Sequence, residues 1–326
     1  MIKNVKYLLV ALNIPVLLFC SVLLAGCVQV TGPYYLETGQ YQEGINSLEQ
    51  AYKENPNEPS SAYYLGRYYL RLEKPDKALP YLQKAVNLDP EDADYHFWLG
   101  VSYWGVDQFD QEQAEYKKTI ALDQYYTSAH LYLGHGYLDK GKWDQALGEY
   151  DQVLKHEAYN PEALFNRAVA LGELNKPKEE IAALKEYISS YPDGSLTLKA
   201  TTALNARGDY TYRNHLIGNR NITLHSIDFR PDSNVLQDVS KESLQVIAAV
   251  MHRNKDLKLN IIAFHASDVT SAKARAHAIR RYIQVQEEGI ASSRLPLSWF
   301  GQAEKVQTSI NHVTLGESVM FVTAVQ

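Results

Sequence analysis

The chain has 326 residues, of which 45% are apolar and 21% charged, and its net charge is −6. This length and apolar content are enough for two domains with hydrophobic cores. The charge is uneven: residues 33–192 carry 15 Lys and Arg against 26 Asp and Glu (net −11), whereas residues 193–326 carry 15 against 12 (net +3). Because an acidic surface repels phosphates and the basic residues form no long run, we expect no nucleic-acid partner.

The N-terminal segment has the layout of a secretory signal. Two lysines precede an apolar run over residues 7–24, and small residues follow it. The segment ends in Leu-Ala-Gly-Cys at Cys27, which resembles the bacterial lipobox. The resemblance implies a lipoprotein signal peptide over residues 1–26 and acylation of Cys27, which would anchor the mature chain to a membrane. The alternative is an uncleaved membrane anchor, because the apolar run is just long enough to span a bilayer.

The residues around this cysteine also indicate a compartment. Val28 follows Cys27, at the place where inner-membrane lipoproteins of enteric bacteria typically carry Asp. The resemblance therefore implies the outer membrane of a bacterial envelope, on its periplasmic face. Cys20 would leave with the leader and Cys27 would carry lipid, so the mature chain would have no disulfide.

A period of 34 residues runs through the next part of the chain. Leucine–glycine pairs end at Gly66, Gly100 and Gly134, and a tyrosine follows each glycine after three residues. A period of 34 with this pattern resembles tetratricopeptide repeats, which are helix–turn–helix units that stack into a solenoid. The resemblance implies an all-α solenoid over residues 27–194, with about four full copies after a partial first one. A capping helix and a linker are expected over residues 195–219.

Individual copies depart from the pattern. Ala78 and Ala146 lie where the two helices of a repeat approach closely, but the copy between them carries Glu112 and Thr119 at positions that usually hold alanine. Pro90 ends a copy, as expected of a residue that lacks a backbone N–H.

The first helix of each repeat lines the concave face in this family, which implies a groove for a protein or peptide. Projection of the repeat predicts that the groove is lined by Tyr63, Arg67, Phe97, Val101, Trp104, Leu131, His135 and Phe165. Such an apolar and aromatic surface suits an extended or helical peptide with hydrophobic anchors. The alternative is that these aromatic side chains pack between helices.

The pattern changes after Gly208. Residues 222–229, 257–264, 297–300 and 319–325 have the character of strands, whereas residues 238–254 and 272–286 have helical spacing. Strands that alternate with helices predict a compact α/β sandwich with helices on one face of the sheet. The expected fold class is therefore α + α/β, an N-terminal all-α solenoid followed by a small α/β sandwich.

Several motifs in residues 220–326 resemble the peptidoglycan-binding OmpA-like domain. They are Ile-Asp-Phe at 227–229, Phe-His-Ala-Ser-Asp at 264–268, Ala-Arg-Ala-His-Ala-Ile at 274–279 and Gly-Ile-Ala-Ser-Ser-Arg-Leu at 289–295. In that family an aspartate and an arginine hold the diaminopimelate of the peptidoglycan stem. The resemblance implies these roles for Asp268 and Arg275, because arginine clamps a carboxylate and aspartate accepts from an ammonium. The alternative for the two residues is an ordinary surface charge pair.

The sequence shows no pattern that indicates catalysis. The ten histidines have no metal-ligand spacing, and phosphate-loop and nucleophile-elbow motifs are absent. We therefore expect no enzyme, no metal and no cofactor.

These features together predict a non-enzymatic outer-membrane lipoprotein that binds a protein through its repeats and tethers a complex to peptidoglycan. The alternative is an assembly or secretion factor, pilotin-like or barrel-assembly-like, whose C-terminal domain binds protein rather than murein. A subunit that assists an enzyme or exports a surface polysaccharide is a third hypothesis.

Overall fold

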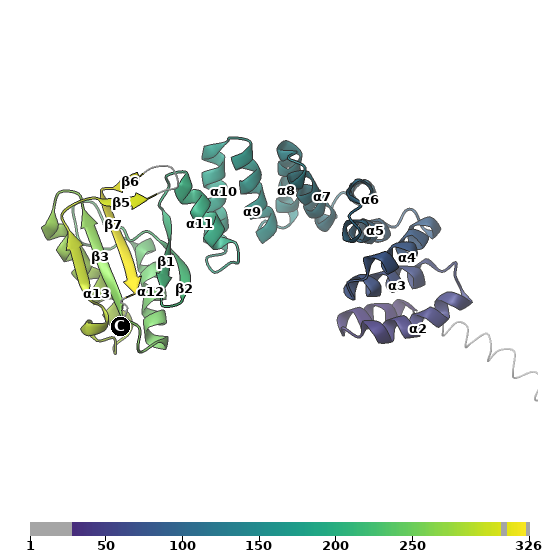
Figure 1. Ribbon diagram of the computed structural model, residues 1–326, viewed down its shortest axis with the longest axis horizontal. Helices are drawn as coiled ribbons and strands as arrows, with labels where there is room; N and C mark the ends of the chain where they lie inside the picture. Colours follow the sequence, from purple (N-terminus) through teal and green to yellow (C-terminus); the bar gives the residue numbers. More distant parts are fainter. Residues whose placement is uncertain (1–27, 308–311, 324–326) are drawn as a thin grey trace, which may run out of the picture. The chain divides into compact units, whose positions relative to one another are not determined.

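The computed structural model describes residues 28–307 and 312–323 (Figure 1). The chain divides between Ala158 and Tyr159 into two compact units. Cys27 and the predicted signal peptide lie outside the described residues, so acylation stays a prediction. In the described ranges, no helix combines the length and the apolar character that a bilayer crossing requires.

The first unit consists of antiparallel helical pairs. Residues 28–37 are helical, and the helices that follow are α2 (Tyr41–Glu54), α3 (Pro59–Arg71), α4 (Pro75–Leu88), α5 (Ala93–Gly105), α6 (Phe109–Leu122), α7 (Thr127–Asp139) and α8 (Trp143–His156). Proline occupies the first position of α3 and α4, where its missing N–H costs nothing. The side chains of Glu58 and Asp92 accept hydrogen bonds from the free N–H groups at the starts of α3 and α5.

The glycines of the 34-residue period lie where the paired helices touch. A Cβ atom at Gly66 would lie 2.5 Å from Leu82, and one at Gly100 would lie 2.6 Å from the ring of Tyr116. The same addition at Gly134 would lie 2.8 Å from a ring carbon of Tyr150. Because these neighbours are fully buried, the repeat requires glycine at this position.

A histidine–glutamate pair links the two helices of one repeat and recurs, one period later, in the next repeat. His96 Nδ1 lies 2.6 Å from Glu115 Oε2, and His130 Nδ1 lies 2.6 Å from Glu149 Oε2. The other ring nitrogen faces a backbone carbonyl oxygen in both cases, at 3.0 Å and 3.2 Å. Both nitrogens of each ring therefore meet acceptors, which only the protonated imidazolium satisfies fully.

The second unit begins with α9 (Pro161–Glu173), α10 (Pro177–Ser190) and α11 (Thr197–Ala206). Two ion pairs tie α10 to the end of α11 and the residues after it: Arg207 Nε lies 2.7 Å from Glu180 Oε2, and Lys185 Nζ lies 2.5 Å from Asp209 Oδ2. A β-hairpin follows, formed by β1 (Tyr212–Ile217) and β2 (Arg220–His225).

The remaining elements form a mixed α/β domain. They are α12 (Asp238–Arg253), β3 (Leu259–His265), α13 (Val269–Gln286), a 3-10 turn (Ser292–Arg294), β4 (Leu297–Phe300), β5 (Glu304–Gln307), β6 (His312–Leu315) and β7 (Glu317–Thr323). The central sheet has the order β4-β3-β7; β4 is parallel to β3 and β7 is antiparallel to it. Strands β5 and β6 form a separate hairpin.

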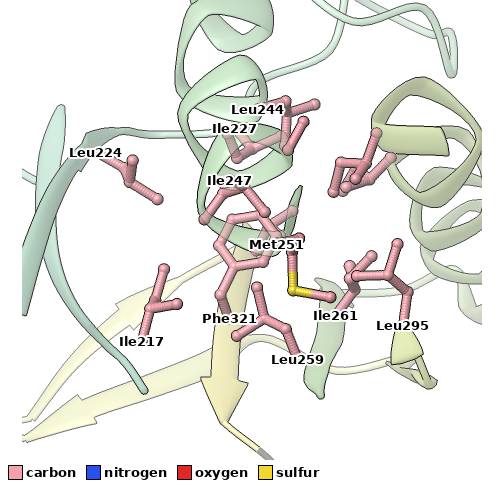
Figure 2. Close-up of a cluster of buried hydrophobic side chains, with 14 of the residues drawn as sticks. Ile217, Leu224, Ile227, Leu244, Ile247, Met251, Leu259, Ile261, Leu295 and Phe321 are labelled. Atoms are coloured by element: carbon pink, nitrogen blue, oxygen red, sulfur yellow. The ribbon is translucent and has the colours of Figure 1, made fainter. Parts of the chain in front are cut away.

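The core of this domain lies between the sheet and its two long helices (Figures 1 and 2). Alternate residues of β3 and β7 point into it, and they meet one face of α12 and of α13. The labelled side chains of Figure 2 that belong to β3, β7 and α12 are Leu259, Ile261, Phe321, Leu244, Ile247 and Met251. The helices therefore cover one face of the sheet, and the predicted α + α/β fold class is confirmed.

The sequence did not indicate the β1–β2 hairpin. Strand β1 lies in the expected linker before residue 220, and the expected domain boundary at 219/220 falls at the turn of the hairpin. The strand expected over 222–229 ends at His225, and Phe229 forms only an isolated bridge with Leu236. The hairpin belongs to the domain because Ile217 and Leu224 are part of its core.

Candidate functional site

The predicted groove residues of the first unit differ in exposure. Tyr63 and Phe97 are only 6% and 4% exposed, whereas Trp104 near the end of α5 is 61% exposed. Val101, Leu131 and His135 are half-buried. The structure therefore places two of the predicted anchors inside the helical packing and leaves Trp104 as the most accessible of the predicted aromatic residues.

Arg67 is held among aromatic side chains. Its guanidinium lies 3.6 Å from the ring centre of Trp98, and Nη1 donates a hydrogen bond of 2.5 Å to the hydroxyl of Tyr63. That hydroxyl donates in turn to Asp94, at 3.3 Å, and Tyr126 donates to the same carboxylate at 2.5 Å. The charge of Arg67 is thus part of a network within the unit.

Phe97 lies in a cluster of rings. Its ring centre is 4.9 Å from that of Tyr126, 5.7 Å from that of Tyr116 and 5.8 Å from that of Tyr132. Tyr132, which the sequence analysis did not single out, is 43% exposed at the edge of this cluster. Phe165 lies in the second unit, half-buried against the ring of Tyr187 at 5.6 Å.

Arg275 is the most constrained of the predicted site residues in the C-terminal domain. It lies on α13, is 6% exposed, and its guanidinium carbon is 4.9 Å from the ring centre of Phe229. Nη1 forms an ion pair of 2.6 Å with Glu317 Oε2 on β7, and Nε has no hydrogen-bond partner among the described residues. The other oxygen of Glu317 lies 3.1 Å from His265 Nε2.

Asp268 has a different role in the structure. Its side chain accepts a hydrogen bond of 2.8 Å from the N–H of Thr270 and caps the start of α13. Hydrogen bonding to Ser271 is the main cause of a pKa below the usual value for this carboxyl. Glu317 is the residue paired with Arg275, and Asp268 belongs to the lining of neither cavity described below.

Two adjoining cavities lie in the C-terminal domain, and Arg275 lines one of them. One, of about 190 Å³, is lined by Arg275 together with Phe229, Gln237 and the strand residues of β3 and β7. The other, of about 220 Å³, lies between the β1–β2 hairpin and the start of β7, and Tyr210, Thr211 and Arg213 form part of its wall. Both share the lining residues Ile227, Asp228, Glu317, Ser318 and Val319.

Asp228, Gln237 and Glu317 were missed by the sequence analysis as site residues. The sequence shows Asp228 only as the middle of the Ile-Asp-Phe motif, and no local pattern places β7 beside it. Glu317 stands in the closing strand, 42 residues after Arg275.

A buried ion pair supports the hairpin side of the larger cavity. Arg213 on β1 donates two hydrogen bonds of 2.8 Å to the two oxygens of Glu304 on β5. Burial raises the pKa of Glu304, but hydrogen bonds and the charge of Arg213 bring it below its usual value. His215, which also lines this cavity, has a pKa lowered to about 4 by burial and by the charge of Arg213.

Within the described residues, no group of three or more histidine, cysteine, aspartate or glutamate side chains could hold a metal ion.

Comparisons with known proteins identify the parts of the chain. Residues 35–97 and 131–195 match tetratricopeptide repeat models, and residues 228–313 match the OmpA family. No curated protein matches the chain.

Solved structures similar to the chain include a MamA protein, with 21% identity over 52% of this chain and 92% of that one (TM-score 0.47). YrrB, described as a TPR protein with an unusual peptide-binding site, has 19% identity over 52% and 88% (TM-score 0.47). MamA from Desulfovibrio magneticus RS-1 has 16% identity over 46% and 83% (TM-score 0.43). On the family matches and the fold, the chain carries tetratricopeptide repeats followed by a C-terminal domain of the OmpA family.

Proposed function

We propose that the protein is a non-enzymatic scaffold of the bacterial cell envelope, anchored to the outer membrane through lipid on Cys27 and facing the periplasm. In this proposal the repeats hold a protein partner while the C-terminal domain contacts peptidoglycan. The observation that carries the proposal is the combination of an interaction module with an OmpA-family domain whose Arg275 lines a polar cavity.

The repeats suggest a protein–protein interaction scaffold, and the exposed side chains indicate its contact residues. Trp104 and Tyr132 present aromatic surface, and Val101, Leu131 and His135 remain partly accessible. Aromatic anchors of this kind contribute most of the binding energy at many interfaces. The net charge of −11 over residues 33–192 favours a partner with basic residues around its apolar anchors.

The OmpA domain suggests peptidoglycan association, and Arg275 is the residue through which we propose it. A carboxylate of the stem peptide would replace the Glu317 carboxylate on the guanidinium, since both make the same charge-assisted hydrogen bond. The side chain of Glu317 is 55% exposed, so it has room to turn outward into solvent once a ligand carboxylate takes its place on Arg275. Asp268 is proposed to assist from the start of α13 rather than from the cavity wall.

Sedimentation with purified peptidoglycan sacculi tests this proposal. We expect the full chain to sediment with sacculi and the Arg275→Ala variant to lose at least nine tenths of the bound fraction. Arg275→Lys keeps the charge but not the fork geometry, and it should bind weakly. The matched control is Arg280→Ala, because Arg280 lies on the same helix outside both cavities and is only half-buried. Circular dichroism checks that each variant is folded.

One observation favours the alternative function. Because Glu317 already pairs with Arg275, the arginine has an internal carboxylate where a ligand would bind. An assembly or secretion factor, pilotin-like or barrel-assembly-like, would need no murein site, and its C-terminal domain would bind protein instead. In that case the wild-type chain would not sediment with sacculi, and Arg275→Ala would leave its partners in envelope extracts unchanged.

A further inference from the structure

Strand β4 forms one edge of the central sheet of the C-terminal domain. Its only strand partner among the described residues is β3, in the order β4-β3-β7. The N–H of Ile261 on β3 donates to the carbonyl of Pro296, and the parallel register places Ile261 beside Leu297. Alternate residues of β4 therefore bond to β3, while the N–H and C=O groups of Leu297 and Trp299 point outward from the sheet. These groups have no hydrogen-bond partner among the described residues.

A row of basic side chains on α13 runs beside this edge. Lys273, His277 and Arg281 are four residues apart and share one face of the helix. Lys273 Nζ lies 5.3 Å from the ring centre of Trp299, and the ring centre of His277 lies 6.0 Å from it. Lys273 and Arg281 are exposed, and neither forms an ion pair with a described residue. Two positive charges without a counter-ion therefore flank the edge of the sheet.

His277 adds a hydrogen-bond donor to this row rather than a third charge. Burial and the neighbouring cations lower the pKa of His277, so its imidazole is neutral near pH 7. Its Nδ1 lies 3.3 Å from Nη2 of Arg280 and accepts a hydrogen bond from it, so Nε2 carries the proton of the neutral ring. The basic row, defined as Lys273, His277 and Arg281, thus has an N–H group between its two cations.

The opposite face of the same edge is apolar. Phe300, the last residue of β4, is 42% exposed and stacks on Phe264 of β3, with ring centres 5.2 Å apart. Because successive side chains of a strand point to opposite faces, Trp299 lies on the helix side of β4 and Phe300 on the open side. A strand added beside β4 would have one face next to the basic row and the other next to an apolar ring.

The spacing of the basic row matches that of alternate residues in a strand. A Cβ atom at Gly301, just after β4, would lie 3.0 Å from Val269 at the start of α13, so β4 and α13 run side by side in opposite directions. Residues four apart on a helix are separated by about 6 Å along its axis. Alternate residues of a strand are separated by roughly 6.6 Å. Acidic side chains at every second position of an added strand would therefore lie opposite successive members of the basic row.

We propose that the β4 edge binds an extended acidic segment of a partner protein, which adds a strand to the sheet and places alternate acidic side chains against the basic row. The outward backbone groups of β4 supply the hydrogen bonds, and the basic row selects the charge of the segment. A second copy of the chain fits less well, because two β4 edges would bring two basic rows together. A lipid surface has no row of backbone groups to pair with β4. The proposal rests neither on the peptidoglycan contact nor on the repeats.

The experiment titrates the full chain, labelled with ¹⁵N in its tryptophans, with a capped Thr-Glu-Val-Glu-Val-Glu-Thr peptide. The backbone amide of Trp299 is the reporter, and the variant Trp299→Phe assigns its signal. We expect a saturable shift of this signal. The same peptide with lysine in place of glutamate should not bind. A peptide of the same composition with its three glutamates adjacent should bind at least tenfold more weakly, because its charges no longer share one face.

Two N-methylated forms of the acidic peptide test strand addition itself. One carries the methyl groups on its glutamate nitrogens and the other on its valine nitrogens, so each lacks one set of alternate N–H groups. Only one set faces the neighbouring strand in a sheet. One form should therefore lose binding and the other should retain it, and the form that fails shows whether the segment runs parallel or antiparallel to β4.

The double variant Lys273→Gln with Arg281→Gln should weaken binding of the acidic peptide at least tenfold. The matched control is Lys199→Gln with Arg220→Gln, which removes two charges from exposed positions on α11 and β2. The control should bind the peptide as wild type does. Reversal of the charges, in Lys273→Glu with Arg281→Glu, should abolish binding of the acidic peptide and permit binding of the lysine peptide. Circular dichroism checks that each variant is folded.

The proposal is overturned if the acidic peptide leaves the Trp299 signal unchanged, if the double glutamine variant binds it as wild type does, or if the two N-methylated forms behave alike. A Trp299 signal that moves with the concentration of the chain itself would assign the edge to a second copy instead. Phosphatidylglycerol vesicles that shift the signal when the peptide does not would assign it to a lipid surface. Peptide binding by a chain that does not sediment with sacculi would refute the peptidoglycan contact alone.

Discussion

A glutamate buried in the repeats should make the solenoid less stable at neutral pH than at mildly acidic pH. Glu112 on α6 occupies the repeat position held by Ala78 and Ala146 in the neighbouring copies. It is 4% exposed, and burial raises the pKa of its carboxyl to about 7, although the positive charge of Lys140 opposes this shift. Folding at higher pH must therefore either bury a charge or retain a proton.

The size of this destabilisation follows from the raised pKa of Glu112. The usual pKa of this carboxyl is 4.5, and each unit of difference corresponds to about 1.36 kcal/mol. The shift of Glu112 therefore sets an upper bound of roughly 3 kcal/mol on the cost, and solvent screening lowers the expected cost to about 1–2 kcal/mol. Because the folded-state pKa is raised, the folded state binds the proton more tightly. The cost is absent below pH 4.5, grows as pH rises to 7, and is complete above that.

The assay is urea unfolding of wild type, Glu112→Ala and Glu112→Gln at pH 5 and pH 8. Glu112→Ala should raise the free energy of unfolding by about 1–2 kcal/mol at pH 8 and by less than half of that at pH 5. Glu112→Gln keeps the size of the side chain and should show the same pH dependence. The reverse change Ala146→Glu should destabilise the protein more at pH 8 than at pH 5. Equal effects of Glu112→Ala at the two pH values would refute the reasoning.

Three further predictions concern stability. Gly100→Ala should cost about 1–3 kcal/mol because its Cβ would lie 2.6 Å from a buried tyrosine ring, whereas Gly148→Ala, with open space around it, should be neutral or stabilising; thermal unfolding compares them. The second variant is His130→Gln. In wild type the hydrogen bond to Glu149 raises the pKa of His130, so the pair contributes its full stability to the folded state below pH 6.5. This stability is lost as pH rises through the pKa that His130 has in the folded state. Compared with wild type, the free energy of unfolding of His130→Gln should therefore fall by more at pH 6 than at pH 9. An equal fall at the two pH values would refute a protonated His130 in the folded state. Glu304→Gln should lower the free energy of unfolding by about 2–4 kcal/mol, because it leaves Arg213 buried without its carboxylate; urea unfolding measures this. A loss in the range of an exposed ion pair, about 0–1 kcal/mol, would contradict the prediction.

The predictions from the repeat pattern and from the C-terminal motifs had different outcomes. The 34-residue period predicted the helical pairs, and the glycines at Gly66, Gly100 and Gly134 lie at the close contacts that the pattern requires. Projection of the same period placed Tyr63 and Phe97 in the groove, but the rotation of each helix within its pair decides exposure, and both side chains are buried. Neighbouring positions along a helix point to different faces, so a small rotation of the helix decides whether a side chain faces the groove or packs between helices.

In the C-terminal domain the motifs identified the family and Arg275, but not the residue that pairs with it. Glu317 follows Arg275 by 42 residues, and Arg213 and Glu304 are 91 residues apart. No local pattern connects such residues. They meet because β7 pairs with β3 and the hairpin packs beside β7.

The sequence by itself determined the repeat architecture, the family of the C-terminal domain and the uneven charge, because these depend on periodicity, short motifs and composition. Only the tertiary structure decided that Asp268 caps a helix, that Glu317 binds Arg275 and that β4 lies at the edge of the sheet. The physical reason is that strand pairing between distant segments sets the surroundings of each charge, whereas a helical repeat places its contacts at a fixed separation along the chain.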